Sequence, residues 1–527
     1  MTFELDYFSV LLFLPLVSIA LGWVLTFSRA PEPQVFLALR ITEVLVASVL
    51  VIQTYAQAAV EVTFFKSLWF GLLPFELGLR GDELSSVMLL SVTVLSLSIF
   101  RYSISYLRGD RKQMEFLRNF QLTLFSISLL ILSNNLMMFF IAWLGTSYGL
   151  HRLLLHYSDR PAAAIAAEKK WWVSRLGDAC LLAAIALTFI FFGTLNFEEL
   201  FVQARVPSFI AQLTHHNEFA LVGLLFVIGA MTKSAQFPFH FWLPETMEAP
   251  TPVSALMHAG IINAGGFLVI RLSPILAHAP GAHALLVLVG GLTAVFGALV
   301  MMTQTDVKRY LAYSTISQLG FMMIECGLGL YTLALFHIVA HGLYKANAFL
   351  STASVLHEPR PPRRSITWRG LVFSATVAIA LMVTGLSLGE HPSAPFYLYL
   401  GVLALGLAQV IGSRSELAEA LLKAPARSLG FLTVGVASYF AFEHYGREAL
   451  RPLLPQGHTP DGMWTVSIVL LFALFIAGKY LSMRMQTLND DWGRRLFIFF
   501  WNGAYVPHLT TKPFEKHFFT KHGVHHA

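Results

Sequence analysis

Runs of about 20 apolar residues recur along almost the whole chain and constrain its fold more than any other feature. A helix needs about 20 such residues to cross the roughly 30 Å hydrocarbon core of a bilayer. Because several run boundaries are soft, we expect about thirteen to sixteen transmembrane helices. The candidate spans are 7–28, 35–60, 86–104, 119–134, 136–155, 173–193, 218–235, 252–272, 283–303, 309–329, 331–356, 370–388, 395–412, 428–443 and 464–485.

The composition excludes the main soluble classes of protein. Of the 527 residues, 56% are hydrophobic and 13% are charged, whereas a soluble protein carries about 25% charged residues. The chain therefore lacks the polar surface of a soluble enzyme or of a nucleic-acid-coating protein, although its net charge is +6. Cys180 and Cys326 have neither disulfide nor zinc spacing, and the sequence has no phosphate loop or dinucleotide fingerprint. We predict an all-α polytopic membrane protein that is no enzyme and holds no metal or cofactor.

Basic residues in alternate loops predict the orientation of the chain. The loops after the odd-numbered spans are much richer in Lys and Arg, and the positive-inside rule places such loops in the cytoplasm. Lys169 and Lys170 belong to one of these predicted loops. The N-terminus is then periplasmic and the C-terminus cytoplasmic. Glu4 and Asp6 stand where a signal peptide has basic residues, so we expect an uncleaved first helix.

Lys233 is the first candidate functional residue within the membrane. It lies near the end of an apolar run, and Pro238 and Pro244 follow it with His240 between them. Because proline removes a backbone donor and clashes with the preceding turn, we expect the helix to break here and line a cavity. Ionisable residues at membrane depth are costly and mark ion or proton pathways. The alternative is a lysine that snorkels from a helix end.

A row of three titratable residues forms the second candidate. His337, His341 and Lys345 are spaced i, i+4, i+8, which places them on one face of a helix about 6 Å apart. Such a row is typical of a water-bridged proton relay, although it also fits a polar stripe that joins helices. His258, one span after Lys233, is either part of this relay or a hydrogen-bonded core histidine.

Several carboxylates are weaker candidates. Asp178 is either the counter-ion of Lys233 or a partner of Arg175. Glu325 lies in an apolar run, where a lone carboxylate is costly without a partner. Glu245 and His240 accompany the expected helix break. Glu43 and Arg40 are three residues apart in the second predicted span, and the simplest interpretation is that they form an ion pair with each other.

Three motifs resemble one family of membrane proteins. The run T-K-S-A-Q-F-P-F-H-F-W-L-P begins at Thr232, D-V-K-R-Y-L-A-Y-S at Asp306, and F-H-I-V-A-H-G-L-Y-K-A at Phe336. They resemble the proton-conducting, antiporter-like subunits of respiratory complex I, cation/proton antiporters and membrane hydrogenases. The resemblance implies two inverted five-helix repeats with broken helices. The site residues that it implies are Lys233 in the broken helix, His258 in the next helix, the relay of His337, His341 and Lys345, and Asp178 beside the first half-channel.

Two positions depart from the family pattern. The family usually has a glutamate after the tryptophan of the fifth span, where this chain has Leu144, and a second broken-helix lysine, where residues 370–389 carry no charge. With these two gaps and the variant motif M-H-A-G-I-I-N-A-G-G from Met257, the chain most resembles one branch of the family. It is the DabB-type membrane subunit of the bacterial two-component inorganic-carbon accumulation system.

The resemblance to this branch implies a function and a partner. A gradient of H+ or Na+ would drive CO2 hydration and bicarbonate accumulation by a large cytoplasmic, zinc-containing, carbonic-anhydrase-like protein at the bacterial inner membrane. Alternatives are a subunit of complex I, a membrane hydrogenase or a multi-subunit antiporter, and a structural anchor whose proton path has decayed. The expected divisions are N-terminal helices 1–104, an antiporter-like core 105–415, C-terminal helices 416–485 and an amphipathic cytoplasmic or interfacial tail 486–527.

Overall fold

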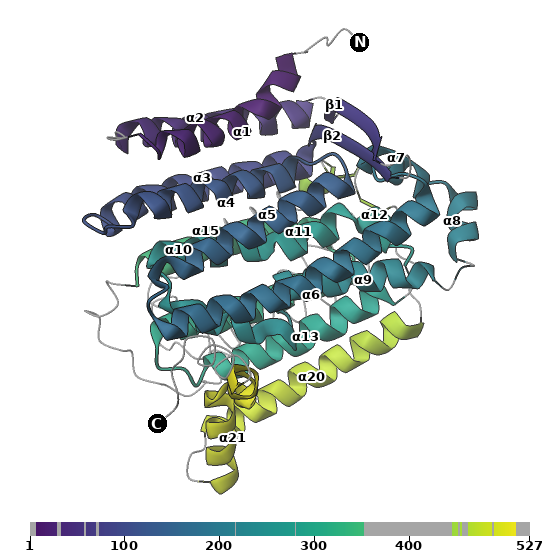
Figure 1. Cartoon of the computed structure of the whole chain (residues 1–527). Helices are drawn as coiled ribbons and strands as arrows, with labels where there is room; N and C mark the ends of the chain where they lie inside the picture. Colours follow the sequence, from purple (N-terminus) through teal and green to yellow (C-terminus); the bar gives the residue numbers. More distant parts are fainter. Residues whose placement is uncertain are drawn as a thin grey trace, which may run out of the picture.

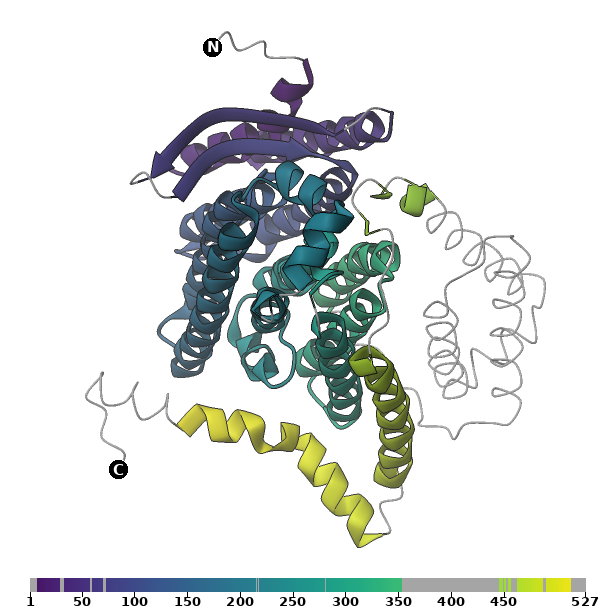
Figure 2. The ribbon, with the colours of Figure 1, turned by 90° about the vertical axis from the view of Figure 1, so that its right-hand side faces the viewer.

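The computed structural model is a bundle of long, roughly parallel helices with a β-hairpin at one end (Figure 1). The bundle places α1 and α2 on one side and α20 on the other, and Figure 2 looks along the helices from the hairpin end. The structure describes residues 7–28, 33–56, 59–69, 73–214, 216, 218–279, 281–352, 445–448, 450–451, 454–455, 462–486 and 490–512.

Most described helices coincide with predicted spans. Among the described residues, seven helices are long and apolar enough to cross a membrane, or eight if the bent pair of α8 (Pro207–Thr214) and α9 (Phe219–Lys233) counts as one. The predicted spans 370–388, 395–412 and 428–443 lie outside the described residues. The long helices are α1 (Tyr7–Leu25), α2 (Pro33–Ala56), α3 (Glu83–Tyr106), α4 (Gln113–Leu132), α5 (Leu136–Leu154), α6 (Pro161–Phe192), α9 (Phe219–Lys233), α13 (Ala282–Met301), α14 (Val307–Gly327), α15 (Tyr331–Leu350) and α20 (Gly462–Gln486).

Helix α6 is 32 residues long and begins 12 residues before the predicted span 173–193. Pro161 stands at its first turn, where the missing N–H costs nothing, and an alanine-rich stretch follows. Lys169 and Lys170 therefore lie inside this helix, with 0% and 2% of their surfaces exposed. Their assignment to a cytoplasmic loop was wrong.

An antiparallel hairpin of β1 (Val60–Trp69) and β2 (Leu73–Gly81) lies between α2 and α3, and the all-helical prediction had no place for it. Beside the hairpin, Asp82 caps α3 and forms a buried ion pair with Arg80 at 2.9 Å and another with Arg271. A polar cavity of about 750 Å³ opens at this end of the bundle, between the hairpin and α7 (Phe197–Gln203). The hairpin end is thus polar and held by ion pairs.

The outer helices face lipid and the tail crosses the opposite end. On α2 and α20, Ile52 and Ile476 are each 71% exposed, as expected for residues in contact with acyl chains. Helix α21 (Asp491–Trp501) turns away from α20 at the end opposite the hairpin (Figures 1 and 2). It buries Phe500 beside Phe296 and exposes large apolar side chains. This matches the amphipathic segment predicted within 486–527, of which residues 513–527 lie outside the described part.

Candidate functional site

Helix α9 ends at Lys233, as the two prolines predict. Ala235 follows with a positive φ of 46°, and short 3-10 turns cover Phe239–Trp242 and Pro244–Glu248. The helix restarts as α10 (Thr251–Ala259), stops again at Gly260 and continues as α11 (Ala264–Arg271). The second interruption was not predicted, although Gly260 was visible in the sequence.

Lys233 is buried in a cluster of polar groups from α5. Its Nζ donates to Thr146 Oγ1 at 2.6 Å, to Ser147 Oγ at 2.9 Å and to the Trp143 carbonyl oxygen at 3.3 Å. It also lies 4.5 Å from the centroid of the Trp143 ring. With 7% of its surface exposed, Lys233 does not snorkel to an interface. All three hydrogens of the ammonium group have an acceptor, so the charged form fits this site.

Lys170 joins the same cluster from α6. Its Nζ donates to the Ser147 carbonyl oxygen at 2.7 Å, so Lys170 and Lys233 bind the same residue. The close approach of α6 to α9 requires Gly177, because a Cβ there would collide with the Thr232 hydroxyl. We call Trp143, Thr146, Ser147, Lys170, Asp178 and Lys233 the α9 cluster. Sequence reasoning missed Lys170 because a basic pair beside a predicted span looks like a loop.

Asp178 pairs with Arg175, one of the two possibilities left open by the sequence. Its Oδ2 lies 2.6 Å from Arg175 Nη2, and its Oδ1 accepts a hydrogen bond from Trp143 Nε1 at 3.0 Å. Trp143 therefore touches both Asp178 and Lys233, which places the carboxylate in the cluster without a direct hydrogen bond to the lysine. The Arg40–Glu43 pair also forms, at 2.5 Å with both side chains fully buried.

His337, His341 and Lys345 occupy one face of α15, and we call them the α15 row. The rings of His337 and His341 have centroids 6.0 Å apart, and Lys345 Nζ donates to the Leu311 carbonyl oxygen at 3.1 Å. Neither ring nitrogen of His341 has a hydrogen-bond partner among the described residues. At membrane depth such nitrogens require water, so the row is a ladder that water has to connect.

Two other candidates flank this row. Glu325 on α14 lies 3.0 Å from His337 Nδ1 and so has a partner at depth. His258 shares a 3.0 Å hydrogen bond with Thr315 and stacks on Phe349 with ring centroids 4.4 Å apart, while its Nε2 has no partner among the described groups. The close packing of α15 against α10 requires Gly342, because a Cβ there would lie 2.8 Å from the Ala259 carbonyl oxygen of α10.

His240 and Glu245, both near the helix break, lie in different surroundings. His240 is buried between aromatic rings, stacked on Phe237 and 4.7 Å from the Phe296 centroid, and does not join either group. Glu245 accepts from Lys169 Nζ at 2.5 and 2.7 Å, and Thr511 of the tail contacts both residues.

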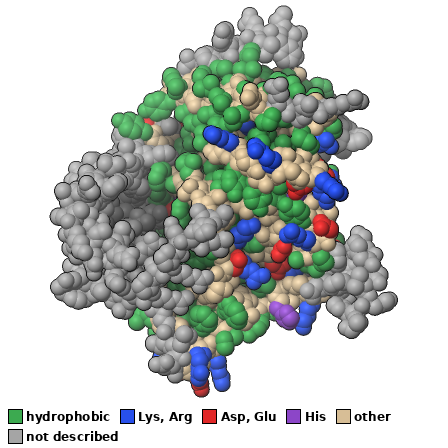
Figure 3. All heavy atoms as spheres, turned by 90° about the vertical axis from the view of Figure 1, so that its left-hand side faces the viewer, with side chains coloured by type: hydrophobic (Ala, Val, Ile, Leu, Met, Phe, Trp, Pro, Cys, Tyr) green, Lys and Arg blue, Asp and Glu red, His purple; other side chains and the backbone are tan. Residues whose placement is uncertain are grey.

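A cavity of about 490 Å³ opens beside Glu245, at the end of the bundle opposite the hairpin. Arg309, His508 and Thr511 also line it, and acidic and basic side chains gather on this face (Figure 3). Across the part of the chain that the structure describes, no three His, Cys, Asp or Glu residues lie together in a way that could hold a metal ion. The polar face therefore consists of ion pairs and a water-accessible cavity.

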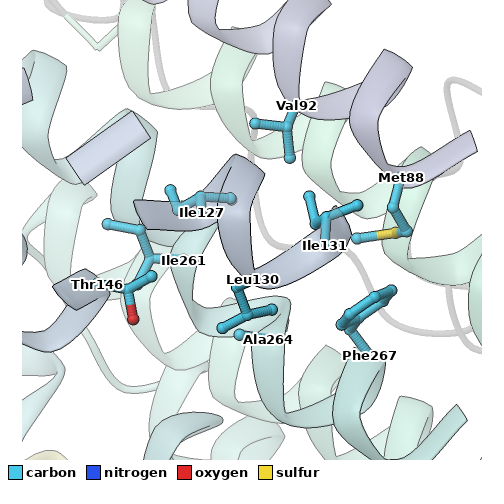
Figure 4. Close-up of a pocket in the computed structure, with 10 residues that line it drawn as sticks. Met88, Val92, Ile127, Leu130, Ile131, Thr146, Ile261, Ala264 and Phe267 are labelled. Atoms are coloured by element: carbon cyan, nitrogen blue, oxygen red, sulfur yellow. The ribbon is translucent and has the colours of Figure 1, made fainter. Parts of the chain in front are cut away.

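A third, much smaller cavity adjoins the α9 cluster on its apolar side (Figure 4). About 20 Å³ is open to the centre of a water-sized sphere, between α3, α4, α5 and the interruption at Gly260. Thr146 supplies the hydroxyl in a lining that is otherwise apolar. A buried water needs two to four polar partners, so this cavity stays dry.

Comparisons with known proteins agree with this architecture. The family model described as "NADH:quinone oxidoreductase/Mrp antiporter, TM" matches residues 133–411, and that of the complex I chain 5 N-terminus matches residues 69–117. The solved Mrp complex of a Dietzia species superposes on 92% of this chain and 57% of its own, with a TM-score of 0.62 and 22% identity. An archaeal membrane-bound sulfane sulfur reductase gives 0.58 and 18% identity over 95% and 97% of the two chains.

Curated relatives include two kinds of membrane subunit. The probable inorganic carbon transporter subunit DabB2 of Halothiobacillus neapolitanus is 42% identical over 65% of this chain and 62% of its own length, and DabB of Hydrogenovibrio crunogenus is 39% identical over 63% and 64%. NADH-quinone oxidoreductase subunit L of Mycobacterium tuberculosis is 34% identical over 68% and 56%. The chain thus covers less than two thirds of the length of each of these relatives.

Proposed function

This chain belongs to the NADH:quinone oxidoreductase/Mrp antiporter family of multi-pass membrane subunits, and from this premise we propose that it is the proton- or cation-conducting subunit of a two-component inorganic-carbon transporter. The observation that carries the conducting role is Lys233, a buried amine at a helix break with hydroxyl acceptors on its Nζ. The similarity to two DabB subunits supports the inorganic-carbon branch.

In this function, protons pass between the α9 cluster and the α15 row through the membrane interior. The cavity beside Glu245 gives water a path from one face toward Lys169. His258 lies on α10, which packs against α15 and follows the break after Lys233. Helix α10 therefore links the two groups of residues.

The proposed partner is a large cytoplasmic, zinc-containing, carbonic-anhydrase-like protein that hydrates CO2. The membrane is the bacterial inner membrane, with the N-terminus periplasmic and the polar face of Figure 3 toward the cytoplasm. The charged rim of this face, with Glu248, Lys308 and Arg309, suits a soluble protein partner. The division into residues 1–104, 105–415, 416–485 and 486–527 stays a prediction.

Replacement of Lys233 by Ala tests the function. In cells that need the system for growth in air, we expect bicarbonate accumulation to fall at least tenfold, because a buried amine at a helix break has no substitute. Lys112→Ala, a change in an exposed loop, is the control. Undiminished accumulation in Lys233→Ala cells would overturn the conducting role.

A subunit of complex I, a membrane hydrogenase or a multi-subunit antiporter is the second candidate, and the similarity to subunit L favours it. It predicts that the chain purifies with many membrane subunits, whereas the first proposal predicts one soluble partner. A structural anchor with a decayed proton path is the third candidate, motivated by Leu144. It predicts that changes of Lys233 and His337 are both silent.

A further inference from the structure

Lys170 is a second buried amine in the α9 cluster, and none of the roles above uses it. Its Nζ and that of Lys233 bind the carbonyl oxygen and the hydroxyl of Ser147, at 2.7 and 2.9 Å. Lys170 is 2% exposed, so water from either face does not reach it freely. One serine thus connects two amines across the interface of α5, α6 and α9.

The carboxylates around this pair are already engaged. Asp178 binds Arg175 and Trp143, and Glu245 binds Lys169. The fifth span offers Leu144 and no carboxylate at the position after Trp143. Because two ammonium groups side by side at low dielectric repel each other strongly, the cluster favours one proton shared by the two amines.

The apolar cavity of Figure 4 gives this proton no polar route on its own side of the cluster. Thr146 borders the cavity, and its hydroxyl already donates to the Trp143 carbonyl oxygen at 2.8 Å. A water in the cavity would have one polar neighbour, which is too few to hold it there. Away from the cavity, Ser147 offers the proton of Lys233 a polar neighbour that also contacts Lys170.

We propose that Lys170 is a second proton-carrying residue, which exchanges a proton with Lys233 through the Ser147 hydroxyl; this rests on the proposed conducting function. In one transfer an N–H bond of the Lys233 ammonium breaks as an O–H bond forms at Ser147. The transfer requires the Ser147 hydroxyl to turn toward Lys170 Nζ, which in the structure binds the carbonyl oxygen of the same residue. The original Ser147 O–H bond breaks as an N–H bond forms on the neutral Lys170 amine. One ammonium and one amine are present before and after the step.

Lys170→Arg tests this role, because the guanidinium keeps the charge and its donors but does not release a proton in proteins. The measurement is proton flux, with a pH-sensitive dye, into membrane vesicles from cells that make the full chain with its co-purifying partner. We expect at least a tenfold loss. Lys112→Arg, the same change at an exposed lysine outside the α9 cluster, is the control, and we expect at least half of the flux to remain.

Ser147→Ala decides the case if Lys170→Arg loses flux only because arginine is larger than lysine. Alanine removes the connecting hydroxyl, keeps the carbonyl oxygen that binds Lys170 and leaves room, so we expect at least a fivefold loss of flux in a normally folded protein. Ser128→Ala removes another buried hydroxyl, without a hydrogen-bond partner in the described region, and should be silent.

Lys233→Met in the same vesicles separates the two proposals. If Lys233→Met abolishes flux while Lys170→Arg or Ser147→Ala keeps it, the role of Lys170 is wrong and the conducting function stands. If Lys233→Met leaves flux unchanged, the conducting function itself fails.

Discussion

Lys233 and Lys345 are both buried amines in the membrane interior, yet their surroundings differ. Lys233 has two hydroxyls and a carbonyl oxygen within hydrogen-bond distance, whereas Lys345 binds one carbonyl oxygen, that of Leu311. Near Lys345, His341 and the Nε2 of His258 have no partner among the described residues. The α9 cluster is therefore connected by protein groups, and the α15 row depends on water. The comparison teaches that one chain holds two buried amines in two different kinds of surroundings.

The largest expected effects come from removing the buried amine of either region. Lys233→Met and Lys345→Met should each lower proton flux at least tenfold, and the double variant should be no worse than either, because steps in series are not additive. Flux into vesicles measures this. A double variant with the product of the two losses would show that the two regions conduct independently.

A matched pair of threonine variants sharpens the comparison. Thr146→Val removes a hydroxyl that accepts from Lys233 at 2.6 Å, and Thr315→Val removes one that bonds the His258 ring at 3.0 Å. Hydrogen bonds to charged groups are worth more than neutral ones, so we expect the free energy of unfolding to fall by about 2 kcal/mol in the first and about 1 kcal/mol in the second. Thermal unfolding of the purified variants measures both. Equal losses would mean that Lys233 is held as a neutral amine.

The smallest effect is expected at the dry cavity. Val92→Ile adds one methylene toward a void of about 20 Å³ and should raise the free energy of unfolding by about 0.5 kcal/mol, with proton flux unchanged. Val94→Ile, on the same helix but outside the lining, is the control. A loss of flux in the Val92 variant alone would place water, and part of the path, in this cavity.

The apolar runs and the prolines were sufficient to predict the long helices and the break after Lys233. They were not sufficient for features that depend on tertiary partners. The buried pair of Arg271 with Asp82 joins residues far apart in sequence, and no pattern in either segment reveals it. The hairpin was missed because Val60, the first residue of β1, was read as the end of the span 35–60, and residues 61–85 were assigned to no element.

Among the site residues, spacing placed His337, His341 and Lys345 on one face but could not assign Glu325 to His337, since that contact joins two helices. The charge count also misled, because it treats every lysine beside a span as a loop residue. Lys170 is a helix residue, and its alanine-rich flank after Pro161 was the available signal.

Helix α6 is about 48 Å long at about 1.5 Å per residue, well beyond the roughly 30 Å hydrocarbon core. In this helix Lys169 binds Glu245 and Thr511 of the tail, and its neighbour Lys170 binds the Ser147 carbonyl oxygen. Because the two lysines are neighbours in one helix, a rotation of α6 about its axis moves both of them. A rotation of α6 that moved Lys169 against the tail would therefore also move the Lys170 amine against Ser147.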